Sequence, residues 1–217
     1  MAGLSARGDV LQHQLAFAVR FDDHFMRAPV PEELVVSLVG DPARPVLAPG
    51  GTTARQPDGT YRFVDLADGP WSLTVNSSRG LWMSLAPLAP IDAAAAAAPE
   101  PVRYDLWPTV RAQAPPGVTC IRGKVTGGAI EGLKVELAPV AESFDRWTQT
   151  DADGEFLFLL PLPLPVDDDG LATLKVQLDS GERIVTEGSV FGEYMQEFTG
   201  DQFKVRPGRE FRVEFET

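Results

Sequence analysis

The chain has 217 residues, enough for one large all-β domain or two modules of roughly 100 residues, and its 44% hydrophobic and 23% charged residues are typical of a globular protein. The formal net charge is −12, and residues 117–217 alone carry 19 acids against 10 bases, a net charge of −9. Because affinity for nucleic acids comes mostly from clustered Lys and Arg, this acidic composition argues against a nucleic-acid partner.

The single cysteine and the lack of long apolar stretches exclude further classes of protein. Cys120 is the only cysteine, so an intrachain disulfide and a cysteine-based zinc site are both excluded. No stretch reaches the length of a signal peptide or a membrane span, LAFAV being the most apolar part of the N-terminal region. We therefore expect a cytoplasmic protein without membrane insertion, either free or as part of an assembled or released particle.

The 20 glycines and 19 prolines predict many short strands joined by tight turns. We divide the chain into an N-terminal tail, a first β-sandwich, a Pro- and Ala-rich linker and a second β-sandwich, at residues 1–13, 14–86, 87–116 and 117–217. The predicted fold is all-β, with two tandem antiparallel sandwiches.

The first predicted strand ends in the sequence FDDHF, which contains the nearest approach to a metal or acid–base cluster. On a strand Asp22 and His24 share a face, while Asp23 points to the other. Two ligands do not make a site, so we interpret FDDHF as a polar strand end that turns into a loop. We predict no catalytic residue, no cofactor and no metal ligand.

Two motifs recur in the same order at nearly the same spacing. LVVSL at 34–38 is followed by DGTYRF at 58–63, and LKVEL at 133–137 is followed by DGEFLF at 153–158. In both copies large residues alternate as in a half-buried strand, and the Asp-Gly pair supplies the positive φ that a tight turn needs. Such a repeat indicates two copies of one module.

The predicted linker contains an Ala run between prolines, followed by the apolar segment VRYDLW. The proline content favours a semi-extended connection. Val102, Tyr104, Leu106 and Trp107 are too apolar for solvent, so we expect this segment to pack as a strand or strap against one module, the alternative being a partner-binding segment.

Two acidic turns lie in the second module, at 151–155 and 167–170. Asp151-Ala152-Asp153-Gly154-Glu155 resembles the start of a calcium loop, but Leu162 stands where an EF-hand requires Glu. Asp and Gly also occur together in tight turns for conformational reasons alone. We favour the turn, and calcium binding stays open as an alternative.

The run FLFLLPLPLPV, at 156–166, is more apolar than a solvent-exposed loop, and its prolines suit an edge strand or a strap. An exposed part of it would dock a partner; the alternative is a loop folded over its own core. Tryptophans outside the strongest strands carry the same ambiguity. The candidate docking residues are Trp82, Trp107, Trp147, Leu160, Leu162 and Leu164.

The pattern Arg122-Gly123-Lys124-Val125, then LKVEL, then TDADGEFLF resembles the carboxypeptidase regulatory-like domain, a transthyretin-like β-sandwich. The first half resembles it more distantly, through LVVSL and DGTYRF, and has Gln56-Pro57 in place of the Thr-Asp lead-in. The resemblance implies fold more than function.

We therefore expect a non-enzymatic structural or adaptor protein, a rigid β-sandwich spacer that docks onto other protein subunits of a larger assembly, such as a phage-tail-like or contractile injection particle. The alternative is a carbohydrate- or peptide-binding module, which predicts exposed aromatic side chains, such as Trp71, Trp82 or Trp147, lying coplanar on one face. A hydrolase using Asp22 or His24 is the third alternative.

Overall fold

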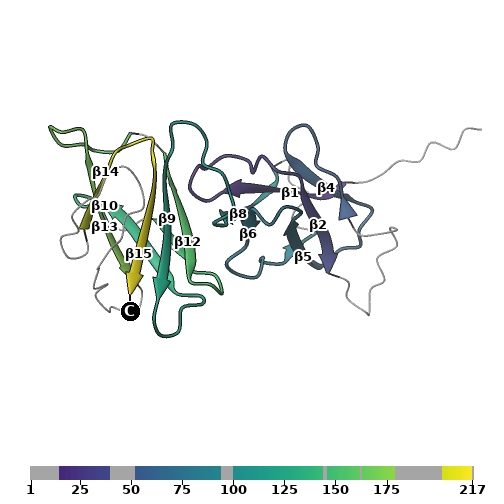
Figure 1. The fold of residues 1–217 in the computed structure, drawn as a ribbon. Helices are drawn as coiled ribbons and strands as arrows, with labels where there is room; N and C mark the ends of the chain where they lie inside the picture. Colours follow the sequence, from purple (N-terminus) through teal and green to yellow (C-terminus); the bar gives the residue numbers. More distant parts are fainter. Residues whose placement is uncertain are drawn as a thin grey trace, which may run out of the picture.

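The computed structural model describes six stretches of the chain, and within them every regular element is a β-strand. The described residues are 15–39, 52–93, 100–143, 146–161, 163–178 and 202–216. Among them there is no helix with the length and hydropathy that a membrane span requires. The prediction of an all-β fold is confirmed. The two halves of the chain lie side by side (Figure 1).

Eight strands make the N-terminal half, arranged as two sheets in the orders β4-β1-β8-β6 and β3-β2-β5-β7. Large apolar residues alternate along the strands and fill the space between the sheets, among them Phe17, Val36 and Tyr61. The strands are β1 (Leu15–Asp23), β2 (Leu34–Val39), β3 (Thr52–Thr53), β4 (Thr60–Val64), β5 (Pro70–Ser77), β6 (Trp82–Met83), β7 (Ile91–Asp92) and β8 (Val102–Pro108).

Seven strands make the C-terminal half, in the orders β12-β9-β15 and β11-β10-β13-β14. A second buried cluster lies between them and contains Val135, Phe158 and Val213. The strands are β9 (Thr119–Thr126), β10 (Lys134–Pro139), β11 (Arg146–Gln149), β12 (Glu155–Leu160), β13 (Ala172–Leu178), β14 (Gln202–Val205) and β15 (Glu210–Glu216).

The two halves repeat one strand order, apart from β6. Sheet β4-β1-β8 corresponds to β12-β9-β15, and β3-β2-β5-β7 corresponds to β11-β10-β13-β14. LVVSL therefore lies on β2 and LKVEL mostly on the equivalent β10, while the Asp-Gly turns at Gly59 and Gly154 precede the equivalent strands β4 and β12. The repeat in sequence coincides with a repeat of topology.

One strand pair in each half differs from the predicted antiparallel arrangement. β8 pairs with β1 in parallel, and β15 pairs with β9 in parallel. A parallel pair needs a crossover connection instead of a hairpin, and here the chain passes through the opposite sheet before it returns beside the first strand. The sandwiches are therefore mixed, with all other pairs antiparallel.

The stretch predicted as a linker, 87–116, is partly structured. It contributes β7 and the seven-residue β8, which pairs with β1 over Val19–Asp23. The expectation that VRYDLW packs as a strand is confirmed, because Leu106 and Trp107 are buried. The chain then continues along 109–118 towards β9.

Both Asp-Gly turns have the positive φ expected of them, 81° at Gly59 and 75° at Gly154. In the first, the Asp58 carboxylate accepts hydrogen bonds from the Thr60 amide and hydroxyl at 3.0 and 2.6 Å. In the second, Asp151 takes this role, because its Oδ1 accepts from the amides of Asp153 and Glu155 at 3.0 and 2.9 Å.

Candidate functional site: a buried aromatic junction

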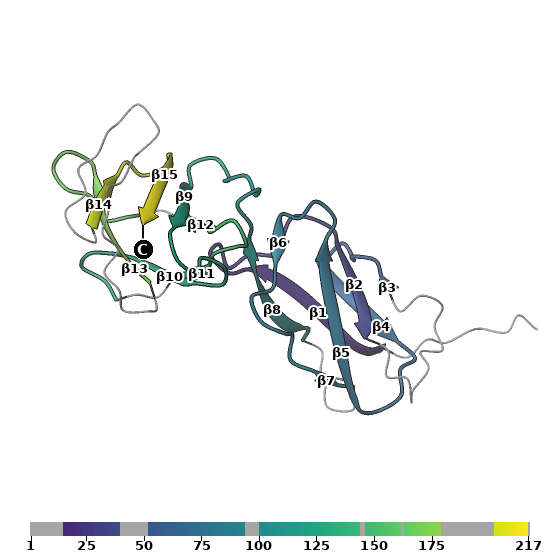
Figure 2. The ribbon, with the colours of Figure 1, turned by 60° about the horizontal axis from the view of Figure 1, so that its bottom comes forward.

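Because β1 and β8 pair in parallel, their C-terminal ends lie side by side at one end of the sheet. Asp23 lies opposite Leu106, and the His24 amide donates to the Leu106 carbonyl at 2.9 Å. His24, Phe25 and Trp107 therefore leave the N-terminal half together, on the side that faces the C-terminal half. Figure 2 shows this end of β1 close to β11.

Aromatic rings from both halves meet there. The His24 ring stacks on Trp107, with centroids 4.4 Å apart and an angle of 21° between the planes. Trp107 also contacts Trp147 of β11 at 5.0 Å, and its indole N–H donates to the Trp147 carbonyl at 3.0 Å. Phe25 lies 5.4 Å from Phe158 of β12. Each aromatic pair contributes about 0.5–1.5 kcal/mol beyond the area it buries.

The buried cluster of the C-terminal half extends into the N-terminal half. Phe25 and Trp107 belong to it, 5% and 9% exposed, and Met26, Leu81, Met83 and Leu85 pack against it. This explains why the run 156–160 on β12 is apolar without alternation and buried throughout. One face of β12 lies on the core of its own sandwich, and the first half and the segment 110–114 supply apolar cover to the same cluster.

The polar residues of FDDHF form the turn and join it to β8. The Asp22 carboxylate accepts two hydrogen bonds from Arg20, at 2.8 and 2.7 Å. Asp23 Oδ1 accepts from the amides of Phe25 and Met26 at 2.8 and 3.1 Å, and desolvation by burial raises the pKa of this carboxyl against the effect of those two hydrogen bonds.

His24 is fixed by a neighbouring carboxylate. Its Nδ1 lies 3.0 Å from Asp105 Oδ2, to which Arg27 also donates at 2.9 Å. The sequence interpretation of FDDHF as a polar strand end that turns into a loop fits these contacts, because Asp23 supports the turn and Asp22 pairs with Arg20 on the strand. Within the described residues, no group of three or more His, Cys, Asp or Glu side chains is placed to hold a metal ion.

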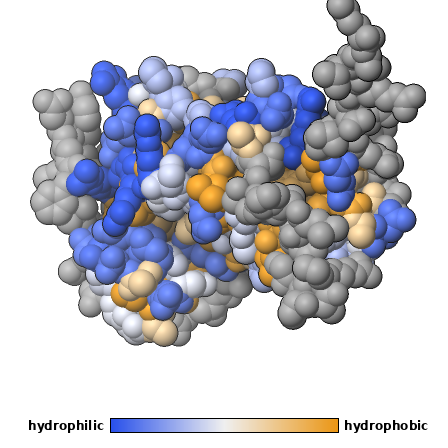
Figure 3. Space-filling model, turned by 90° about the vertical axis from the view of Figure 1, so that its right-hand side faces the viewer, coloured by the Kyte–Doolittle hydropathy of each residue, from blue (hydrophilic) through white to orange (hydrophobic). Residues whose placement is uncertain are grey.

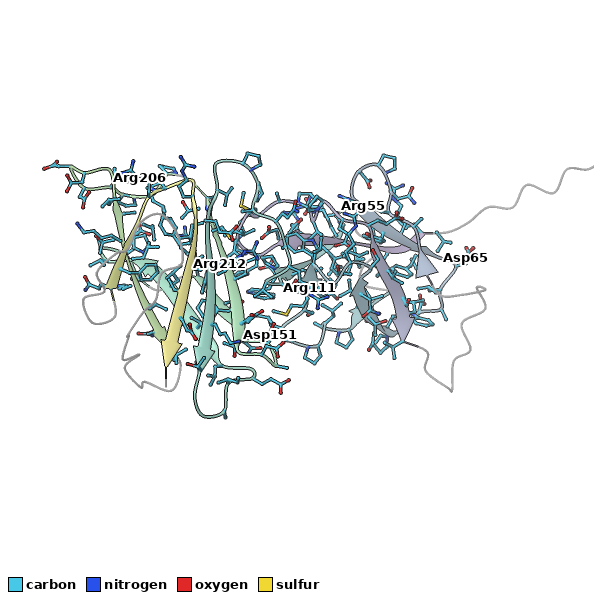
Figure 4. The ribbon with its side chains drawn as sticks, in the orientation of Figure 1. Arg55, Asp65, Arg111, Asp151, Arg206 and Arg212 are labelled. Carbon is cyan, nitrogen blue, oxygen red and sulfur yellow. The ribbon has the colours of Figure 1, made fainter. Side chains whose placement is uncertain are left out.

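A charged groove of about 560 Å³ lies on the outer face of β9, β12 and β15. Arg122 closes one side of it, since its guanidinium donates to Glu210 at 2.9 Å and to the carbonyls of Val110 and Ala112, the latter at 2.6 Å. Figure 4 labels Arg111 and Arg212, which also line the groove. The groove alternates positive and negative side chains instead of offering an apolar pocket.

The six candidate docking residues divide between core, junction and partly exposed positions. Leu160 and Leu164 are 0% and 6% exposed within the second cluster, so they are core residues that a partner cannot reach. Trp107 is buried at the junction, and Trp147 is partly exposed beside it. Trp82 is partly buried on β6 against the first cluster. Leu162 lies outside the described residues.

The aromatic platform that a carbohydrate-binding module requires is not formed by the three tryptophans proposed for it. Trp71 is 5% exposed in the first core, where its indole N–H donates to the Ala67 carbonyl at 2.9 Å. Trp147 packs against Trp107 and lies on the other half of the chain. Burial therefore removes the stacking face of Trp71, and the contact with Trp107 occupies part of the Trp147 ring.

The acidic turns use their carboxylates for the backbone. Asp167 Oδ1 accepts from the amides of Asp169 and Leu171 at 3.1 and 3.0 Å, the same pattern that Asp151 makes in its own turn. Asp167 also pairs with Lys204 at 2.8 Å, which lowers the pKa of this carboxyl. These contacts account for the Asp-Gly spacing by turn geometry.

Cys120, the single thiol, lies on β9 and is 0% exposed, so it packs as a small hydrophobic side chain. Burial raises its pKa to about 11. Exposed apolar side chains occur at the far end of the N-terminal half, where Leu15 and Val39 are each 45% exposed; Figure 3 shows hydrophobic side chains among hydrophilic ones on that side.

Sequence reasoning missed Phe25 and the role of Trp107 as a bridge between the halves. The only sequence signal for this contact was the apolar run on β12, which indicates that other residues cover the strand but does not identify them. The repeat predicts the equivalence of the halves and says nothing about which residues touch across them.

No protein-family model matches the chain, and no curated protein matches it significantly. Among solved structures, the Bacillus anthracis TIE protein aligns at 10% identity and a TM-score of 0.31, over 94% of this chain and 34% of that one. A streptococcal ancillary pilin aligns at 11% identity and a TM-score of 0.31, over 94% and 62%. An adhesin from Mobiluncus mulieris aligns at 10% identity and a TM-score of 0.31, over 86% and 85%. The chain thus spans about a third of the first of these proteins and under two thirds of the second.

Proposed function

We propose that this protein is a non-enzymatic structural component, a rigid spacer made of two carboxypeptidase regulatory-like modules that stand in a fixed relation within a larger protein assembly. The observation that carries the proposal is the junction, where Trp107 and Phe25 of one half are buried in the hydrophobic cluster of the other. A flexible tandem would have a polar, hydrated connection between its modules instead.

The physical argument concerns the cost of bending. Moving one half against the other would expose Trp107 and Phe25, and burying an aromatic side chain of this size is worth roughly 1.5–3 kcal/mol. It would also break the hydrogen bond from the Trp107 indole to the Trp147 carbonyl. A spacer built in this way transmits position and orientation between whatever binds at its two ends.

The repeated strand order supports the assignment of two related modules, since a β-sandwich with a parallel pair of first and last strands occurs twice in one chain. The contacts of FDDHF also support a structural role, because Asp23 accepts from the turn amides and His24 contacts Asp105 of β8, while Asp22 pairs with Arg20 along β1.

The test is a distance measurement between the halves. Spin labels are placed at Ser72→Cys on β5 and Gln177→Cys on β13, both exposed; Cys120 can stay because it is buried. We expect a narrow distance distribution in the otherwise unchanged chain and a broad one after Trp107→Ala. A broad distribution before any change at Trp107 would refute the rigid spacer.

A further inference from the structure

The outer edge of β15 differs from the equivalent edge in the other half. β8, the counterpart of β15, has β6 on its outer edge, where Trp82 pairs with Pro108 and Met83 with Trp107. β15 pairs with β9 on one side, and no other described strand pairs with it. In the N-terminal half β6 therefore covers the edge of β8, whereas in the C-terminal half no described strand covers the equivalent edge of β15.

The backbone of β15 is suited to accept another strand. It pairs with β9 over seven consecutive residues without a register shift and contains no proline. The amide of Cys120 donates to the Arg209 carbonyl at 3.0 Å. In a parallel ladder this hydrogen bond places the backbone N–H and C=O groups of the odd-numbered residues of β15 on the side of β9. The N–H and C=O groups of Glu210, Arg212 and Glu214 then point outward from the sheet edge.

The strand carries charged side chains on its outer face but lacks three other features that block an edge. Natural edge strands are often protected by bulges, prolines or charges that point into the core. In β15 the core-facing Phe211 and Val213 are apolar and only 8% and 4% exposed, so they hold the strand in place. Its charged side chains lie on the outer face, beside the charged groove.

A second copy of β15 can pair with this edge over its full length and bring opposite charges together at its centre. If a second copy of β15 adds antiparallel about Val213, the outward-facing Arg212 lies opposite Glu214 of that copy, and the pair occurs twice by symmetry. In the same register Glu210 lies opposite Glu216 of the copy, a like-charge pair that also occurs twice. Two cations of its own chain offset the charge of Glu210: Arg122 at 2.9 Å and Arg212 at 3.8 Å. A shift by one pair towards the start of the strand sets Arg212 against itself, and the opposite shift sets Glu214 against itself. A shift by two pairs towards the start sets Arg212 opposite Glu210 but overlaps only residues 210–212 of the two strands, whereas the register about Val213 overlaps all seven residues.

We propose that two copies of this chain associate through β15, so that the sheets β12-β9-β15 of both copies join into one continuous six-stranded sheet around a two-fold axis. The contact consists of backbone hydrogen bonds along the edge and two Arg212–Glu214 pairs between copies. It does not depend on the rigidity of the junction, because β15 lies in the C-terminal half alone (Figure 1).

The experiment is sedimentation equilibrium of the full chain over a wide concentration range. It is run near 0.15 M salt, because a charge of −12 on each copy repels at long range and a Debye length of about 8 Å screens that repulsion. We expect concentration-dependent dimers. Arg212→Glu and Glu214→Arg should each weaken association at least about tenfold, since each replaces two attractive pairs by repulsive ones.

The double variant Arg212→Glu/Glu214→Arg restores both pairs and should return association to within about threefold of the starting value. Arg103→Glu is the matched control: it changes the net charge as Arg212→Glu does, and Arg103 is exposed on β8 of the other half, away from the edge of β15. Thermal unfolding followed by circular dichroism checks that each variant is folded.

Three outcomes would overturn the proposal. One is a monomer at every concentration up to about the millimolar range, where even weak specific contacts associate. Another is a double variant that stays as weak as the single ones. The third is a loss with Arg103→Glu equal to that with Arg212→Glu, which would attribute the effect to net charge. Amide exchange gives a second readout: the Arg212 and Glu214 amides should exchange more slowly as protein concentration rises.

Discussion

Replacing Trp107 by Ala should both destabilise the protein and uncouple its halves. Trp107 is 9% exposed, stacks on His24, contacts Trp147 and donates a hydrogen bond to the Trp147 carbonyl. Truncating a buried Trp to Ala costs about 3–5 kcal/mol, which includes the transfer free energy and the cavity left behind. Because this side chain belongs to the cluster of the C-terminal half while its backbone lies in β8, the loss falls on the contact between the halves.

Urea denaturation measures both effects. The unchanged chain should unfold in one transition, and Trp107→Ala in two, each with a smaller m value because each exposes less surface. The control is Trp71→Ala: Trp71 is 5% exposed and donates a similar hydrogen bond, but lies wholly within the N-terminal half. It should lower stability by a similar amount in that half and leave the distance between the halves unchanged. A single transition for Trp107→Ala, with a loss under about 1 kcal/mol, would refute this reasoning.

Three further predictions concern single positions. Gly154→Ala should lower the free energy of unfolding by more than about 2 kcal/mol, because the φ of Gly154 is 75° and a Cβ there would lie 2.3 Å from the Val125 carbonyl oxygen. The control is Gly170→Ala, where φ is 73° and the surrounding space is open, so only the backbone conformation should cost stability, about 1–2 kcal/mol. Equal losses for the two variants would count against the steric argument. Hydrogen bonds from Thr60 and Arg62 lower the pKa of Asp58 to about 2, so this carboxylate stabilises the fold above its ordinary pKa of 3.8, and the contribution is lost as the pH falls towards 2. The Asp58→Asn variant should therefore have a lower melting temperature at pH 7 and lose less stability on acidification. Parallel curves of melting temperature against pH for the two proteins would contradict this. The Cys120 thiol, buried and with a pKa of about 11, should not react with a thiol-specific disulfide reagent at pH 8 until the chain is unfolded in urea, and rapid labelling of the folded protein would show that β9 opens readily.

The sequence by itself determined the local structure. Alternating apolar residues in LVVSL and LKVEL specify half-buried strands, since side chains of a strand point to opposite faces in turn. Asp-Gly pairs specify the turns before β4 and β12, because only Gly takes a φ near +80° without strain. The repeat of these short-range features also predicts that the two halves are equivalent, and the strand orders match that expectation.

Contacts between residues far apart in the chain were decided only by the tertiary structure. Nothing in the sequence pairs β8 with β1 in parallel, so nothing predicts that His24 and Trp107 emerge side by side. The sequence suggested that the apolar run on β12 could dock a partner, because a local pattern shows that a segment is apolar but not which residues cover it. Phe25 and Trp107 provide that cover, more than 40 residues away in sequence. Likewise, the edge of β15 with which no described strand pairs is recognised only by comparison with the edge of β8, which β6 covers.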